Sequence, residues 1–134
     1  MLQVGLGCWK IPKDCCAEAV NTALQNGYRL LDGACDYGNE VQVGQGIAQA
    51  VASGIPRKDI FVTSKLWNTF HESKRVREGC MRTLADLGLD YLDLYLIHFP
   101  IAMPYVDPAD RYPPEWGNME RSQATLHETW AVLP

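Results

Sequence analysis

Four side chains with complementary acid–base chemistry follow successive strand-like runs of the sequence. Asp32 and Tyr37 lie in YRLLDGACDYGNE, Lys65 lies in IFVTSKLWN and His98 lies in YLDLYLIHFP. A tyrosine hydroxyl, with an ordinary pKa of about 10, is a weak acid at neutral pH, and a nearby cation makes it a better proton donor. The sequence therefore indicates a site that protonates a carbonyl oxygen while hydride reaches the carbonyl carbon.

Each of these side chains has a distinct place in that chemistry. Lys65 would stabilise the tyrosinate form of Tyr37, and Asp32 would offset the cost of placing an ammonium group in a partly dry pocket. His98 would hold the carbonyl oxygen by a hydrogen bond. Taken singly, each residue also has a structural interpretation, as a solvated strand end, a core imidazole, a helix cap or a surface aromatic.

The elements that position these residues alternate between strand and helix. Apolar and β-branched runs predict four strands, at residues 4–8, 28–32, 60–65 and 91–97. Apolar residues at helical spacing predict helices over residues 14–26, 39–53, 76–88 and 122–134. The apolar stripe of the second helix includes Val43, Ile47, Ala50 and Val51, and the fourth strand is so continuously apolar that we expect both of its faces to be covered.

Caps and a loop complete this pattern. Asp14 is expected to cap the first helix, and Asn39 with Gln42 three residues later predicts a capping box for the second. Residues 100–122 contain five prolines, too many for a helix, and predict a functional loop. The fourth helix then opens near Ser122 and stops at Pro134 after roughly three turns.

Strict alternation requires a parallel sheet, in either a doubly wound open sheet or a (β/α)8 barrel. The segment GQGIAQ (residues 44–49) resembles a dinucleotide fingerprint, but Gln49 replaces the third glycine and the segment lies inside a predicted helix. In a barrel, catalytic groups come from the carboxyl ends of several strands, where Asp32, Lys65 and His98 fall. We therefore predict an α/β fold: the N-terminal half of a (β/α)8 barrel, with about four β/α units and a fourth helix cut short.

The composition is that of an ordinary soluble globular domain and excludes several function classes. Of the 134 residues, 47% are hydrophobic and 21% charged, and the net charge of −4 leaves no basic patch for a nucleic acid. No apolar run reaches the ~20 residues that span a bilayer, and the N-terminus has no secretory pattern. We expect a cytosolic protein with neither nucleic-acid nor membrane partners.

The cysteines and histidines argue against disulfides and metals. The five cysteines are odd in number and include no C-x-x-C pair, so we expect reduced thiols. The three histidines have no partners at metal-ligand spacing, so no metal site is expected.

Four motifs make the chain resemble the aldo-keto reductase family. They are GLGCWK (5–10), LDGACDYGNE (31–40), TSKLWN (63–68) and LDYLDLYLIHFP (89–100). The resemblance covers nearly the whole chain, so residues 1–134 are interpreted as one partial domain of that family. Within it, HFPIAMPYVDPADRYPPEW (98–116) is similar to the loop of the fungal D-xylose reductase branch.

The resemblance implies roles for the four residues. Tyr37 would be the general acid, Lys65 and Asp32 the pair that tunes it, and His98 the residue that orients the carbonyl group of the bound substrate. The substrate would be a small aldehyde or an aldose such as xylose. NADPH, or NADH in some members, would be the hydride donor.

The same resemblance implies binding residues. The cofactor would lie near Trp9, Lys10 and Asp32. Aromatic walls and an acid that meets a sugar hydroxyl would form the substrate pocket with His98, namely Trp9, Trp67, Phe99 and Asp36. Aromatic packing at the barrel mouth is the alternative interpretation for Trp67.

Other outcomes remain open at this point. A non-catalytic relative that uses the same fold as a binding module is the alternative function. In the family, segments after the later strands hold the cofactor phosphates, so we expect the 134 residues alone to bind NADPH weakly and to be inactive. An open half-barrel exposes sheet edges, which also predicts self-association.

Overall fold

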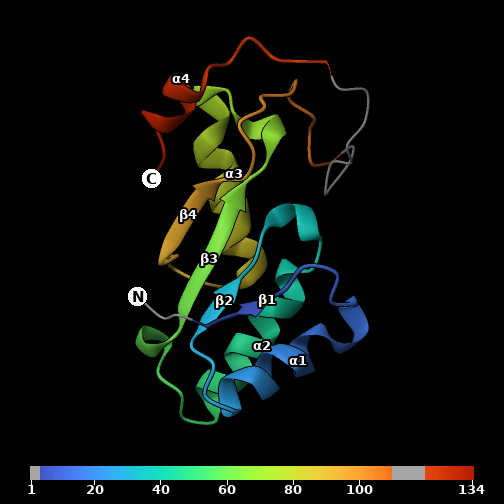
Figure 1. Cartoon of the computed structure of the whole chain (residues 1–134), viewed down its shortest axis with the longest axis vertical. Coiled ribbons are helices and arrows are strands. Elements are labelled where there is room, and N and C mark those ends of the chain that lie inside the picture. Colours follow the sequence, from blue (N-terminus) through green and yellow to red (C-terminus); the bar gives the residue numbers. More distant parts are fainter. Residues whose placement is uncertain (1–3, 110–119) are drawn as a thin grey trace.

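The computed structural model describes residues 4–109 and 120–134, which form an α/β arrangement around one parallel sheet. The strands lie side by side in chain order, and the helices occupy the connections between them (Figure 1). The strands are β1 (Leu6–Gly7), β2 (Leu30–Asp32), β3 (Phe61–Leu66) and β4 (Leu94–Ile97). The α-helices are α1 (Lys13–Gln25), α2 (Glu40–Ala52), α3 (Ser73–Leu87) and α4 (Leu126–Trp130), and the 3-10 turns are η1 (Cys35–Tyr37), η2 (Arg57–Asp59) and η3 (Asn68–Phe70). The predicted alternation and the parallel sheet are confirmed.

The register of the sheet separates a helix-covered face from a face that carries charge. Leu31 of β2 pairs with Val62 of β3, and both are at most 1% exposed beneath α1 and α2. Because side chains alternate along a strand, Asp32 and Lys65 project from the opposite face. Leu96 of β4, the register partner of Lys65, lies on that face too and is 37% exposed.

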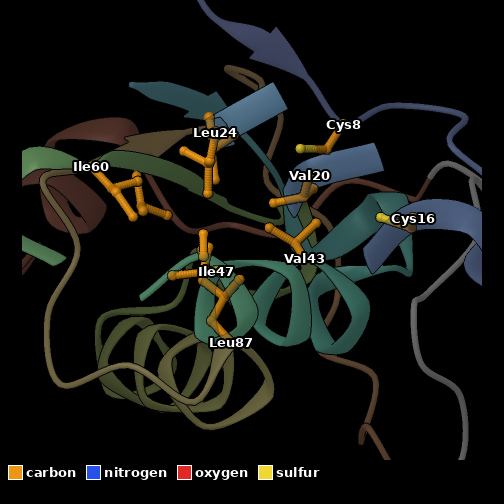
Figure 2. Packing of buried hydrophobic residues seen from close by; sticks show 11 residues of the cluster. Cys8, Cys16, Val20, Leu24, Val43, Ile47, Ile60 and Leu87 are labelled. Carbon is orange, nitrogen blue, oxygen red and sulfur yellow. The ribbon is translucent and has the colours of Figure 1, made fainter. Parts of the chain in front are cut away.

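The main core lies between the sheet and the first two helices. Cys16, Val20 and Leu24 project from α1, and Val43 and Ile47 project from α2 (Figure 2). All five are at most 2% exposed. The helical spacing predicted for both segments is confirmed at these positions, and the packed helices fix the strands from which the charged side chains emerge.

The glycines in the segment that resembles a dinucleotide fingerprint have a packing role in α2. A Cβ atom at Gly44 would lie 2.1 Å from the carbonyl oxygen of Leu87 in α3. A Cβ atom at Gly46 would lie 2.6 Å from the carbonyl oxygen of Ala17 in α1. Both glycines therefore let a neighbouring helix approach α2 closely. The segment lies inside a helix, as predicted.

Three local predictions are wrong. Asp14 does not cap α1, because the helix begins one residue earlier with Pro12 at its N-cap. Val51 does not belong to the buried stripe of α2 and is 39% exposed. β4 is not covered on both faces, since it lies at the edge of the sheet with Leu94 and Leu96 partly exposed.

The segment after β4 follows the prediction in part. Residues 101–106 contain neither helix nor strand, as predicted for the loop, and residues 110–119 lie outside the described part of the chain. The fourth helix, predicted from near Ser122 to Pro134, is confined to Leu126–Trp130. It begins later because Thr125 accepts a hydrogen bond from the backbone of Glu128 in a reciprocal capping box.

The structure also bears on the cysteines, on metal sites and on membrane-spanning helices. All five cysteines are free, and each is buried except Cys15. Residues 4–109 and 120–134 contain no cluster of three His, Cys, Asp or Glu side chains arranged to hold a metal ion. Over the same ranges, no helix combines the length and apolarity needed to cross a bilayer.

Candidate active site

Three of the four residues predicted to take part in proton transfer meet at the carboxyl edge of the sheet. Lys65, near the end of β3, places its ammonium group between Asp32 at the end of β2 and Tyr37 in η1. Its Nζ lies 2.9 Å from Oδ1 of Asp32, 2.9 Å from the carbonyl oxygen of Gly33 and 3.0 Å from the hydroxyl of Tyr37. An ammonium group has three donors, so these acceptors satisfy all of them.

The surroundings of Lys65 keep it charged. Its side chain is 13% exposed, whereas that of Asp32 is 44% exposed. Burial lowers the pKa of Lys65, but the hydrogen bonds to Tyr37 and Asp32 and their charges raise it, and the net direction is upward. A cation is therefore held 3.0 Å from the phenolic oxygen of Tyr37, where it stabilises negative charge that develops on that atom.

His98 follows β4 and completes the predicted group. Its ring meets that of Tyr37 edge-on, with centroids 5.8 Å apart. Burial, and then the positive charge of Lys65, lower the pKa of His98 to about 4, although Asp32 opposes them. The imidazole is therefore neutral at pH 7, with one nitrogen able to donate a hydrogen bond and the other able to accept.

Aromatic rings support the histidine from one side. Phe99 stacks on His98 with centroids 4.5 Å apart and an interplanar angle of 12°. Trp67 is fully buried and meets the rings of His98 and Phe99 edge-on, at 5.3 and 6.0 Å. For Trp67 this geometry favours the packing interpretation over a wall of an open pocket.

Trp9, Lys10 and Asp36 lie near this edge but outside the hydrogen-bonded group. Trp9 and Lys10 follow β1, where the ammonium of Lys10 lies 4.5 Å from the indole centroid of Trp9. Trp9 is 63% exposed, and Lys10 has a φ of 61°, a conformation rare for non-glycine residues. Asp36 lies in η1 beside Tyr37, and burial raises the pKa of its carboxyl group.

The predicted capping box at Asn39 is wrong, and the residue has a different role. Its side chain forms no cap on α2. Instead, its amide nitrogen donates hydrogen bonds to the carbonyl oxygens of Cys8, at 2.9 Å, and Ile11, at 3.1 Å. Asn39 therefore ties the segment after Tyr37 to the chain that leaves β1, a tertiary contact that its local sequence does not signal.

Sequence reasoning also missed a buried carboxyl group behind the site. Glu40, the first residue of α2, accepts hydrogen bonds from Oγ of Ser64 at 2.6 Å and Oγ1 of Thr83 at 3.2 Å. Ser64 immediately precedes Lys65 in β3. The only signal available was an acidic residue close after Tyr37, and it is indistinguishable from an ordinary first-turn acid.

Comparison with known proteins links this geometry to a family. The model of the Aldo/keto reductase family matches residues 1–133. A probable NAD(P)H-dependent D-xylose reductase of Aspergillus clavatus is 56% identical over 135 residues, which cover 97% of this chain and 41% of that protein. The NAD(P)H-dependent D-xylose reductase of Aspergillus niger is 53% identical over 135 residues, with coverages of 97% and 42%.

Solved structures give the same result. The aldose reductase of Schistosoma japonicum matches with a TM-score of 0.86 and 42% identity, over 96% of this chain and 42% of that chain. An aldo-keto reductase of Bombyx mori in complex with NADP matches with a TM-score of 0.81 and 40% identity, over 95% and 40%. The chain thus spans about two fifths of the length of these relatives, which agrees with the predicted half of a barrel.

Proposed function

Since the chain belongs to the aldo/keto reductase family, we propose that it carries the proton-transfer half of a reductase site. The complete reaction would be the NAD(P)H-dependent reduction of an aldehyde or an aldose to the alcohol, of the xylose-to-xylitol type. One observation carries the proposal: the ammonium of Lys65 binds Asp32 and the hydroxyl of Tyr37 at the same time. That arrangement is what a phenolic general acid requires.

In this proposal each residue acts on the carbonyl oxygen of the substrate. The neutral His98 donates a hydrogen bond to that oxygen and orients it. As negative charge grows there, Tyr37 gives up its proton, and Lys65 stabilises the phenolate that remains. Asp32 keeps the Lys65 ammonium in place by accepting a hydrogen bond from it.

The cofactor and substrate assignments rest on the family resemblance, and the position of these residues near the same edge supports them. NADPH, or NADH, would supply the hydride when bound, with Trp9, Lys10 and Asp32 at its border. Trp9 presents an exposed indole, while Asp32 is partly open to solvent. Asp36 and Phe99 are assigned to the substrate side, and the free thiols fit a reducing cytosol.

A chimeric reductase tests the proposal. Residues 1–134 would replace the matching part of the Aspergillus niger D-xylose reductase, whose remaining length has no counterpart in this chain. We expect the folded chimera to oxidise NADPH when D-xylose or a simple aldehyde is added. The same chimera with Tyr37→Phe is the matched control and should be nearly inactive.

Two results would contradict the proposal. A folded chimera that binds NADPH but reduces no aldose or simple aldehyde would favour the alternative, a non-catalytic binding module. A Tyr37→Phe chimera that retained the full rate would place the proton donor elsewhere.

A further inference from the structure

Glu40 is a buried carboxyl group that joins three elements from behind the site. It is 4% exposed, and its partners Ser64 of β3 and Thr83 of α3 are fully buried. The two carboxyl oxygens accept separately, Oε1 from Ser64 and Oε2 from Thr83. A buried carboxyl group with two hydroxyl donors fixes the start of α2 against both the strand and the helix.

Adjacent residues of β3 hold the same short segment from opposite faces of the sheet. Ser64 donates to Glu40 on the helix-covered face, while Lys65 donates to Tyr37 on the other face. Tyr37 and Glu40 are three residues apart. Gly38, with a φ of 70°, turns the chain between them in the left-handed region that glycine adopts readily.

We infer that Glu40 is a positioning residue that keeps the hydroxyl of Tyr37 within hydrogen-bond distance of the Lys65 ammonium. It does so by fixing residues 37–40 to β3 and α3, so that η1 cannot slide along the strand. The importance of this contact for catalysis rests on the proposed function. The contact itself can be measured without turnover.

The reach of the Glu40 side chain matters more than its charge. Burial raises the pKa of Glu40 to about 7, against the hydrogen bonds from Ser64 and Thr83, so both protonation states are populated at neutral pH. Hydroxyl groups can donate or accept, and they satisfy either state. Glutamine at position 40 would therefore keep both contacts, whereas alanine would keep neither.

Magnetic resonance of the lysine ammonium protons in the full 134-residue chain tests the inference. In the unmodified chain we expect contacts from the Lys65 ammonium to the Tyr37 ring, whose centroid is 4.8 Å from Nζ, and to Gly33. Glu40→Ala should lose the contact to Tyr37 and keep the contact to Gly33. Glu40→Gln should keep both, as should Glu18→Ala, which removes an exposed carboxylate from α1.

Equal loss of the Tyr37 contact in Glu40→Ala and Glu40→Gln would overturn the inference, because charge and not reach would then be responsible. An unchanged contact in Glu40→Ala would overturn it too. If Glu40→Ala does not fold, the Ser64→Ala/Thr83→Val double variant breaks the same two hydrogen bonds by removing their donors and keeping the carboxyl group. That variant should weaken the Tyr37 contact, and a full contact in the folded protein would overturn the inference.

The chimeric reductase supplies an independent readout. Glu40→Ala should lower kcat by about 10²-fold, as a small misplacement of a reacting group does, with little change in KM, and Glu40→Gln should restore most of the rate. If the unmodified chimera is inactive, the proposed function fails, while the resonance experiment still decides the role of Glu40. An active chimera whose kcat is unaffected by Glu40→Ala would overturn the positioning role.

Discussion

Lys65 and Tyr37 come from different β/α units, yet Nζ and the phenolic oxygen lie 3.0 Å apart. The two residues are separated by 28 positions in the chain, so only the packing of η1 against β3 brings them together. The proposed chemistry therefore depends on a contact that only the folded chain forms. Substitutions at or near these two residues should have separable effects on the catalytic rate, on the pKa of neighbouring groups and on the free energy of unfolding.

Removing the Tyr37 hydroxyl should abolish proton transfer and leave binding intact. In the chimeric reductase, Tyr37→Phe should lower kcat by ~10² to 10⁴-fold with little change in the KM for NADPH. Steady-state kinetics over a range of pH measures this. Tyr28→Phe, which changes an exposed tyrosine two residues before β2, is the control and should keep the rate.

Glu40 should make the folded chain less stable as the pH rises. The ordinary pKa of its carboxyl group is 4.5, and burial raises the folded value to about 7, with the charge of Asp86 adding to this and that of Lys65 opposing it. At pH values between these two, the carboxyl group is ionised in the unfolded chain but protonated in the folded chain. Its contribution to the free energy of unfolding is therefore full below pH 4.5 and decreases by about 3 kcal/mol as the pH rises through 7.

Urea unfolding of the 134-residue chain and of Glu40→Gln at several pH values measures this effect. The difference in unfolding free energy between the two proteins should change across that window and favour Glu40→Gln above pH 7. Taking the difference cancels the titration of all other groups. A difference that did not vary with pH would show that Glu40 is not held in its neutral form.

The order of the strands and of the first three long helices, and the meeting of the proposed catalytic residues at one edge, were predictable from the sequence for a physical reason. Strand-like runs and helical spacing are local patterns, and parallel strands bring their carboxyl ends to one edge, where Asp32, Lys65 and His98 were expected. The roles of Asn39 and Glu40 were not predictable, because both partner sets are distant in the chain. The exposure of β4 was missed for a similar reason, since an apolar run does not reveal which neighbours cover it.

The neutral state of His98 should depend on Lys65. In the 134-residue chain, the His98 imidazole resonances should titrate with a pKa of about 4. Lys65→Met should raise that pKa, because a cation that disfavours imidazolium is removed while Asp32, which favours it, remains. Lys58→Met, at an exposed lysine of η2, should leave it unchanged. An unchanged pKa in Lys65→Met would separate His98 from the Lys65 charge.

A side chain at Gly44 should destabilise the packing that supports the site. The Cβ of Gly44→Ala would lie 2.1 Å from the backbone oxygen of Leu87, so α2 and α3 would have to move apart. We expect a loss of about 1–3 kcal/mol, measured by urea unfolding. Gln45→Ala, at an exposed position of the same helix, should be nearly neutral. A stable Gly44→Ala variant would contradict the close contact between these helices.

The 134 residues alone should bind NADPH weakly and show no aldehyde-dependent oxidation of it. Tight binding of an anionic dinucleotide needs several cationic or backbone donors on its phosphates. Lys65 cannot supply one, because Asp32, Gly33 and Tyr37 occupy its three donors. The chain carries a net charge of −4 and covers 41% of the length of its Aspergillus clavatus relative, and we expect the remaining donors in the part of such relatives that it does not match.

Isothermal titration of NADPH into the purified chain measures the affinity, with size-exclusion chromatography to report self-association. The chimeric reductase is the positive control and should bind at least tenfold more tightly than the isolated chain. Micromolar binding by a monomer of the 134 residues, together with aldehyde-dependent loss of NADPH absorbance, would show that these elements alone hold both cofactor and substrate. The assignment of phosphate binding to other segments would then be wrong, and Lys10, beside the exposed indole of Trp9, would be the first residue to substitute.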